Sequence, residues 1–137
     1  MLEHILKVRV YYSDVDALGI VYHANYLNYL ERARTESLRE LGYDLPTLKE
    51  KYQLQIAICN LSMKFTNPAR IDDILYIKST VTKVQRLSFY YNQVIHINDE
   101  QGPLACSAEL KLVGVDLNLK PTVLPEAVRM ELANGSR

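Results

Sequence analysis

The pattern of apolar and polar positions predicts one long helix near the start of the chain. After Asn25, apolar or small residues recur at spacings of three and four as far as Leu41, and charged residues occupy most of the other positions. This spacing is typical of an amphipathic helix with one buried stripe. Gly42 is a typical residue just beyond a helix end. We therefore expect a helix over residues 25–41, with its charged residues, Arg34 among them, on the surface.

Period-two patterns predict strands on both sides of this helix. The first strand is expected at residues 5–12, and later strands are expected at residues 54–65, 75–84, 87–97 and 104–116. Lys83 is predicted to share the face of Leu75, and Gly114 is predicted to mark a bulge. Short helices are expected at residues 45–52 and after Pro125.

The order of strand, long helix and four strands predicts an α+β fold in one domain, residues 1–137. Consecutive strands favour an antiparallel sheet with the long helix on one face. One helix covers only part of such a sheet and leaves an edge strand open. Natural proteins often cover such an edge with a second copy, so we expect a homo-oligomer.

Composition narrows the function classes. The 137 residues are 48% hydrophobic and 23% charged with a formal net charge of zero, which disfavours nucleic acid as a partner. No apolar run reaches the roughly 18 residues of a membrane helix, and the N-terminal residues do not resemble a signal peptide. Cys59 and Cys106 lie in apolar runs and are expected to be buried thiols. These features predict a cytoplasmic protein without membrane insertion.

The residues with chemical potential precede the long helix. Asp14 and Asp16 flank Val15, Gly19 permits a backbone bend, and Tyr22-His23-Ala24-Asn25 leads into the first turn. A helix N-terminus presents free N–H groups and partial positive charge that stabilise a developing oxyanion. A carboxylate beside it can attack a carbonyl carbon or activate water. This pattern favours acyl transfer.

Two other interpretations of the acidic turn are open at this point. Asp16 is also a common residue type in Asx turns, where it has only a structural role. The Asp-x-Asp pattern with nearby His23 also suits a metal ion, but no second His or Cys lies at ligand spacing. We therefore expect no metal.

Three motifs give the chain a resemblance to a known family. They are Y-x-D-x-D-A-x-G-I-V-Y-H-A-N-Y-L followed by L-E-R-A-R, F-x-N-P-A-R-x-D-D-x-L at residues 65–75, and R-x-S-F at residues 86–89. Together they resemble the hotdog-fold acyl-CoA thioesterases of the 4-hydroxybenzoyl-CoA thioesterase type. Within that family the chain is most similar to the bacterial subgroup associated with the Tol–Pal system.

The resemblance implies a hotdog fold, in which a five-stranded antiparallel sheet wraps the long helix. It also implies that two copies form one continuous sheet, that dimers often form tetramers, and that the active site lies between two subunits. The family's catalytic carboxylate corresponds to Asp16, acting as nucleophile or as general base. The backbone N–H that polarises the thioester carbonyl corresponds to His23.

The same resemblance matches Tyr22 and Arg86 to family positions, with Arg86 facing the phosphates of coenzyme A. Gly19, Tyr22, Tyr26 and Arg86 are the expected substrate-binding residues, Tyr26 as an aromatic residue that lines the acyl pocket. Leu18 stands at a position that is often small in the family, so the substrate preference is left open. The implied function is hydrolysis of acyl-CoA to a carboxylic acid and free coenzyme A, with no cofactor beyond the coenzyme A of the substrate. The alternatives are an acyl-carrier-protein thioesterase and a non-catalytic scaffold that binds acyl-CoA or a protein.

Overall fold

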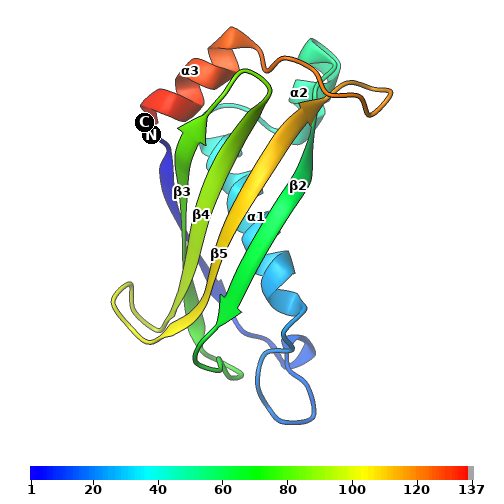
Figure 1. Ribbon diagram of the computed structural model, residues 1–137. Helices are drawn as coiled ribbons and strands as arrows, with labels where there is room; N and C mark the ends of the chain where they lie inside the picture. Colours follow the sequence, from blue (N-terminus) through cyan, green and yellow to red (C-terminus); the bar gives the residue numbers. More distant parts are fainter. Residues whose placement is uncertain (136–137) are drawn as a thin grey trace.

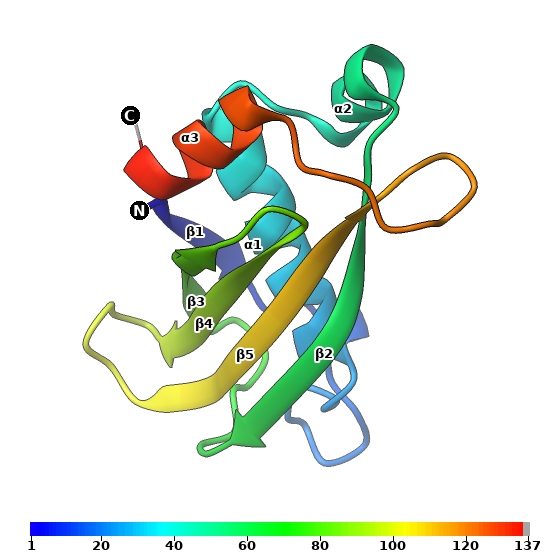
Figure 2. The ribbon, with the colours of Figure 1, turned by 45° about the horizontal axis from the view of Figure 1, so that its top comes forward.

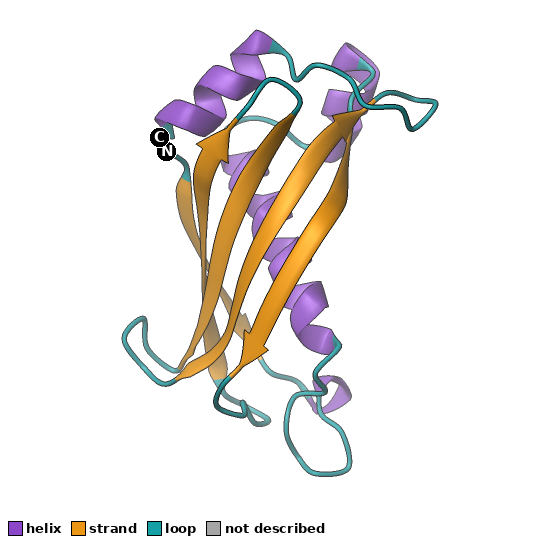
Figure 3. Ribbon diagram, in the orientation of Figure 1, coloured by secondary structure: helices purple, strands orange, loops and turns teal. Residues whose placement is uncertain are grey.

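The computed structural model describes residues 1–135 and confirms the predicted order of elements (Figures 1 and 3). Residues 136 and 137, the last two of the predicted domain, lie outside the described residues. The strands are β1 (Glu3–Arg9), β2 (Gln55–Phe65), β3 (Ile74–Val84), β4 (Ser88–Ile97) and β5 (Leu104–Val115). The helices are the 3₁₀ turn η1 (Tyr12–Asp14), α1 (Asn25–Glu40), α2 (Leu45–Tyr52) and α3 (Glu126–Asn134).

The five strands form one antiparallel sheet in the order β1-β3-β4-β5-β2. The sheet curves around α1, which lies along its concave face, while α2 and α3 lie at one end (Figure 2). This is the predicted α+β arrangement. The first and last strands of that order are edges, so β1 and β2 each leave one side without a strand neighbour.

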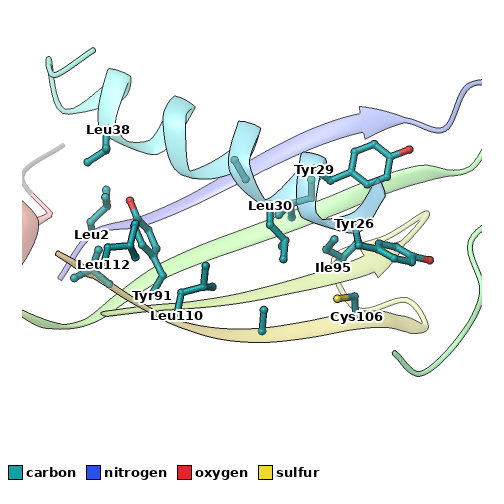
Figure 4. Close-up of a cluster of buried hydrophobic side chains, with 14 of the residues drawn as sticks. Leu2, Tyr26, Tyr29, Leu30, Leu38, Tyr91, Ile95, Cys106, Leu110 and Leu112 are labelled. Atoms are coloured by element: carbon teal, nitrogen blue, oxygen red, sulfur yellow. The ribbon is translucent and has the colours of Figure 1, made fainter. Parts of the chain in front are cut away.

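The core lies between α1 and the concave face of the sheet. Figure 4 shows Leu30 and Leu38 of α1 opposite Tyr91, Ile95 and other side chains from the strands. The face of β4 that carries Tyr91 and Ile95 is buried, and it includes the polar Gln93, which has no exposed surface. Its amide donates to Leu30 O at 3.0 Å and to Ser79 Oγ at 2.9 Å, so the buried polar group is paired.

Two predictions about strand residues are wrong. The β3–β4 register shifts between Val81 and Lys83, so Lys83 is exposed, over the Tyr90 ring, instead of sharing the buried face of Leu75. Gly114 does not mark a bulge. It lets the segment after β5 approach closely, since a Cβ there would lie 2.8 Å from Leu124 Cδ2.

Two predictions about burial are also wrong. Cys59 is exposed, because it lies at a bulge in the edge strand β2, whereas Cys106 is buried as expected. Arg34 is only 8% exposed, although it was expected on the surface with the other charged residues of α1. The helical period alone misplaced it, because a long side chain can turn toward the sheet from the border of the buried stripe.

The first and last described residues lie side by side, next to α3 (Figure 1). Leu2 N donates to Leu132 O at 3.0 Å, and His4 Nε2 lies 2.9 Å from Glu40 Oε2 at the end of α1. Within residues 1–135, no helix has both the length and the hydropathy required to span a bilayer.

Candidate active site

The predicted acidic turn forms a loop between β1 and α1, at the end of the sheet away from α2 and α3 (Figure 1). Its two arms are joined by a bridge between Val15 and Val21. Tyr22 N donates to Asp14 O at 3.1 Å, and Val21 N donates to Ala69 O at 2.9 Å. Main-chain hydrogen bonds therefore fix the loop to the helix start and to the segment after β2.

Asp16 forms an Asx turn at the tip of this loop. Its Oδ1 accepts from Leu18 N at 2.8 Å, and its backbone O accepts from Gly19 N at 2.9 Å. Gly19 has φ +78°, a left-handed conformation that favours glycine. Asp16 Oδ2 accepts no hydrogen bond from the described residues, so one carboxylate oxygen of a half-buried group is available for chemistry.

The helix start, which follows the same loop, offers hydrogen-bond donors. Asn25 N donates to Tyr22 O at 2.8 Å and Tyr26 N donates to His23 O at 3.3 Å, so helical bonding begins with these amides. Within the described chain, the N–H groups of His23 and Ala24 donate to no protein acceptor. They are the unpaired donors expected at a helix N-terminus, where partial positive charge also collects.

Aromatic rings surround the helix start. The His23 ring lies 4.7 Å from the exposed Tyr22 ring and 6.2 Å from that of Phe65, measured between centroids. Phe65 ends β2, is 53% exposed and was not predicted as a site residue, although it begins the second sequence motif. Tyr26, which is also predicted as a substrate contact, is buried in the single chain, and its hydroxyl accepts from Ala69 N at 3.4 Å.

Asp14 has structural contacts that separate it from Asp16. Its Oδ2 accepts from Tyr11 N at 2.8 Å, and its backbone O accepts from Asn25 Nδ2 at 2.9 Å. Burial, and secondarily the nearby Asp14 carboxylate, raise the pKa of Tyr29. Asp14 thus connects η1, the loop and α1, which agrees with a mainly structural role.

The structure does not bring every predicted site residue together in one chain. Asp16, Gly19, Tyr22 and His23 share the loop and helix start, whereas Arg86 lies in the turn between β3 and β4, at the opposite end of the sheet (Figure 1). Among residues 1–135 no group of three or more His, Cys, Asp or Glu could hold a metal ion. The carboxylate and the free N–H groups are suited to attack on a carbonyl whose oxygen the helix start stabilises.

The comparisons with known proteins agree with this geometry. The Thioesterase-like superfamily model matches residues 10–132. The chain is 38% identical to the acyl-CoA thioesterase YbgC of Haemophilus influenzae, over 89% of this chain and 88% of that protein. It is 37% identical to the acyl-CoA thioester hydrolase YbgC of Escherichia coli, over 90% and 91% of the two chains.

The fold is also that of a solved thioesterase. The structure of 4-hydroxybenzoyl CoA thioesterase from Pseudomonas sp. strain CBS-3 matches 96% of this chain and 99% of its own, with a TM-score of 0.87 and 21% identity. This likeness supports the hotdog fold, and the sequence matches support the family. The chain belongs to the Thioesterase-like superfamily.

Proposed function

We propose that this protein hydrolyses acyl-CoA thioesters to a carboxylic acid and free coenzyme A. The observation that carries the proposal is Asp16, held in an Asx turn of the loop that leads into a helix start, where the His23 N–H is unpaired within residues 1–135. The names of the relatives in Haemophilus influenzae and Escherichia coli support the same reaction.

In this mechanism the thioester oxygen accepts a hydrogen bond from the His23 N–H, which polarises the carbonyl. Asp16 then either attacks the carbonyl carbon directly or removes a proton from an attacking water. Both routes place negative charge on the same oxygen, so both use the helix start. Collapse of the tetrahedral species breaks the C–S bond and releases the thiolate of coenzyme A. On the water route this step forms the carboxylic acid, whereas on the direct route a water molecule then hydrolyses the acyl–Asp16 anhydride and frees both the acid and Asp16.

A second copy of the chain completes the proposed site. Residues 58–62 of the edge strand β2 are exposed, and antiparallel pairing of two β2 strands would continue the sheet. The two-fold axis would bring the partner subunit's β3–β4 turn to the end of the sheet that holds Asp16. The partner's Arg86 could then contact the phosphates of the same coenzyme A molecule.

The free thiols Cys59 and Cys106 suit a reducing compartment, so we place the reaction in the cytoplasm. Assembly of dimers into tetramers and a connection to the Tol–Pal system rest on the sequence resemblance alone.

The test is release of free thiol from a panel of short, long and hydroxybenzoyl CoA esters. We expect turnover by the natural sequence and loss of turnover in Asp16→Asn. Absence of turnover with every CoA ester would contradict the proposal. Hydrolysis of acyl-carrier-protein thioesters in their place would favour the carrier-protein alternative, and binding without hydrolysis would favour the scaffold.

Mixed dimers test the contribution of the partner. A dimer of one Asp16→Asn chain and one Arg86→Ala chain has one site with both natural residues only if each site takes its Asp16 and Arg86 from different chains. We therefore expect mixing to restore activity toward half of the natural value. If both residues of a site come from one chain, mixing restores nothing.

A further inference from the structure

Arg34 is a buried cation without an acidic partner among the described residues. It is 8% exposed, and its Nη1 donates to Gln93 Oε1 at 3.0 Å, the one hydrogen bond that its guanidinium makes within residues 1–135. None of the ion pairs in this part of the chain includes Arg34. Burial lowers the pKa of Arg34. Because a guanidinium has five N–H donors, most of its hydrogen-bonding capacity is unused.

Arg34 lines an apolar groove between α1 and the edge strand. The groove has a volume of about 310 Å³, at the lower end of the range for small-molecule pockets. Its walls include Leu38 of α1, Ile56 and Ile58 of β2, and Leu112 of β5. A mostly apolar groove with one buried donor group suits a small apolar ligand that carries an oxygen acceptor.

Glu31 is the acidic residue that borders the same groove. It is exposed, and its Oε1 accepts from Thr35 Oγ1 at 2.9 Å. Its charge influences Arg34, but the two side chains do not form an ion pair. A ligand hydroxyl can accept from Arg34 and donate to Glu31, whereas a ligand carboxylate would be attracted by the first and repelled by the second.

The groove lies close to the helix start of a partner in the proposed dimer. If two β2 strands pair about Leu61, one of their exposed residues, and the bulged residue Cys59 is passed over, then the partner subunit's Phe65 is opposite Ile56. Within each chain Phe65 lies against His23 and Tyr26, with ring centroids 6.2 and 5.6 Å apart. The partner's oxyanion site would therefore open toward the Ile56 end of this groove.

We propose that the groove receives the acyl group of a thioester held at the partner's helix start, and that Arg34 donates a hydrogen bond to an oxygen on that acyl group. Arg34 is then a specificity-determining residue that favours short oxygenated acyl chains, hydroxylated or carboxylated, over plain hydrocarbon chains of equal length. This inference rests on the proposed function.

The experiment compares kcat/KM for matched CoA esters: butanoyl, 3-hydroxybutanoyl and succinyl, then hexanoyl, 6-hydroxyhexanoyl and adipoyl. We expect the natural sequence to prefer an oxygenated ester by about tenfold or more, as for hydrogen bonds to a charged group. Comparison of the hydroxylated and carboxylated esters shows which kind of oxygen accepts the hydrogen bond from Arg34. Because Glu31 is negatively charged, we expect the hydroxylated ester to be preferred. Turnover of all esters without preference would overturn this inference and leave the proposed hydrolysis intact.

Arg34→Met removes the donor and keeps an apolar side chain, and Arg32→Met on the exposed side of α1 is its control. We expect the ratio of oxygenated to plain kcat/KM to fall to about one in Arg34→Met and to stay natural in Arg32→Met. A purely structural role would lower both rates by one factor and leave the ratio unchanged, which would overturn the inference. If Arg34→Met does not fold, the ratio of oxygenated to plain kcat/KM is measured in Arg34→Lys. That ratio and the preference of the natural sequence then test the inference.

Two measurements separate the remaining possibilities. In a mixed dimer of Arg34→Met and Asp16→Asn chains, the active site with natural Asp16 faces the natural Arg34 of its partner, so the preference should return. If mixing does not restore the preference, Arg34 does not act across the interface.

Sedimentation measures whether each variant remains a dimer. If Arg34→Met dissociates and Arg32→Met stays paired, a carboxylate of the second copy fills the groove, which also overturns the proposal.

Discussion

At its N-terminal end, α1 meets a loop held mostly by main-chain atoms, whereas in its second half it meets the sheet through buried side chains. Asp16 is positioned by its own turn and by bridges between neighbouring segments. Arg34 is positioned by Gln93, which is 59 residues away in sequence and also binds Ser79 and Leu30. The first region is built for exposed reactive groups, and the second for a fixed buried network. Mutations should therefore affect rate in one region and stability in the other.

The largest effect is expected from Asp16→Asn. Asn keeps an oxygen that accepts from Leu18 N but cannot act as nucleophile or base, so kcat should fall on the order of 10² or more. The melting temperature should hardly change. The comparison change Asp14→Ala should reduce stability more than kcat, because it removes the side-chain oxygen that accepts from the backbone N–H of Tyr11. A fully active Asp16→Asn enzyme would remove Asp16 from the mechanism.

The next largest effect is expected from Gln93→Leu. This change leaves the Arg34 guanidinium, Ser79 and the Leu30 carbonyl without their common partner, and should lower the free energy of unfolding by about 2 kcal/mol or more. Chemical denaturation measures this loss. The control Asn92→Leu, at an exposed neighbouring position of β4, should change stability by about 0.5 kcal/mol or less. Equal losses in the two variants would refute a special role for the network.

A smaller effect is expected at Gly19, where a substitution should lower both the stability and kcat. A Cβ at Gly19 would meet no atom within 4 Å, so Gly19→Ala introduces only the strain of φ +78°, about 1 kcal/mol. Because the strained turn holds Asp16, kcat should also fall several-fold. Gly19→Asn should recover part of both losses, since Asn tolerates the left-handed region better. No difference between Ala and Asn would argue against backbone strain as the cause.

The smallest effect concerns the two thiols. Like the two regions, one is exposed and the other is buried. Cys59 is exposed on the edge strand, while burial raises the pKa of Cys106 to about 11 and keeps that thiol protonated at neutral pH. A thiol-reactive disulfide reagent at pH 7.5 should therefore modify only one cysteine per chain, and it should do so quickly in the separated chain, where β2 is uncovered. Cys59→Ser should remove the fast phase. Slow reaction of Cys59 in the natural protein would indicate that β2 is covered, as the proposed dimer requires.

The sequence predicted the parts that depend on local pattern. The bounds of α1 and α2, the presence of β3 and β4, and the loop with Asp16 and Gly19 follow from short-range periodicity and turn chemistry. It did not predict the burial of Arg34 or the exposure of Cys59. The first depends on a contact with a distant strand, and the second on a bulge at a sheet edge. Neither leaves a periodic signal in the chain.

The hydrogen bond from Leu2 to Leu132 has a consequence for engineering this protein. Because the first and last described residues are neighbours, a short linker could join residue 135 to residue 1 with little distortion of β1 or α3. New chain ends could then be opened in the exposed turn after β4, at Asp99 and Glu100. Such a circular permutant would keep the loop with Asp16 and the helix start continuous in sequence. It would also move any attached tag or fused domain from the α3 end of the sheet to the end that holds Asp16.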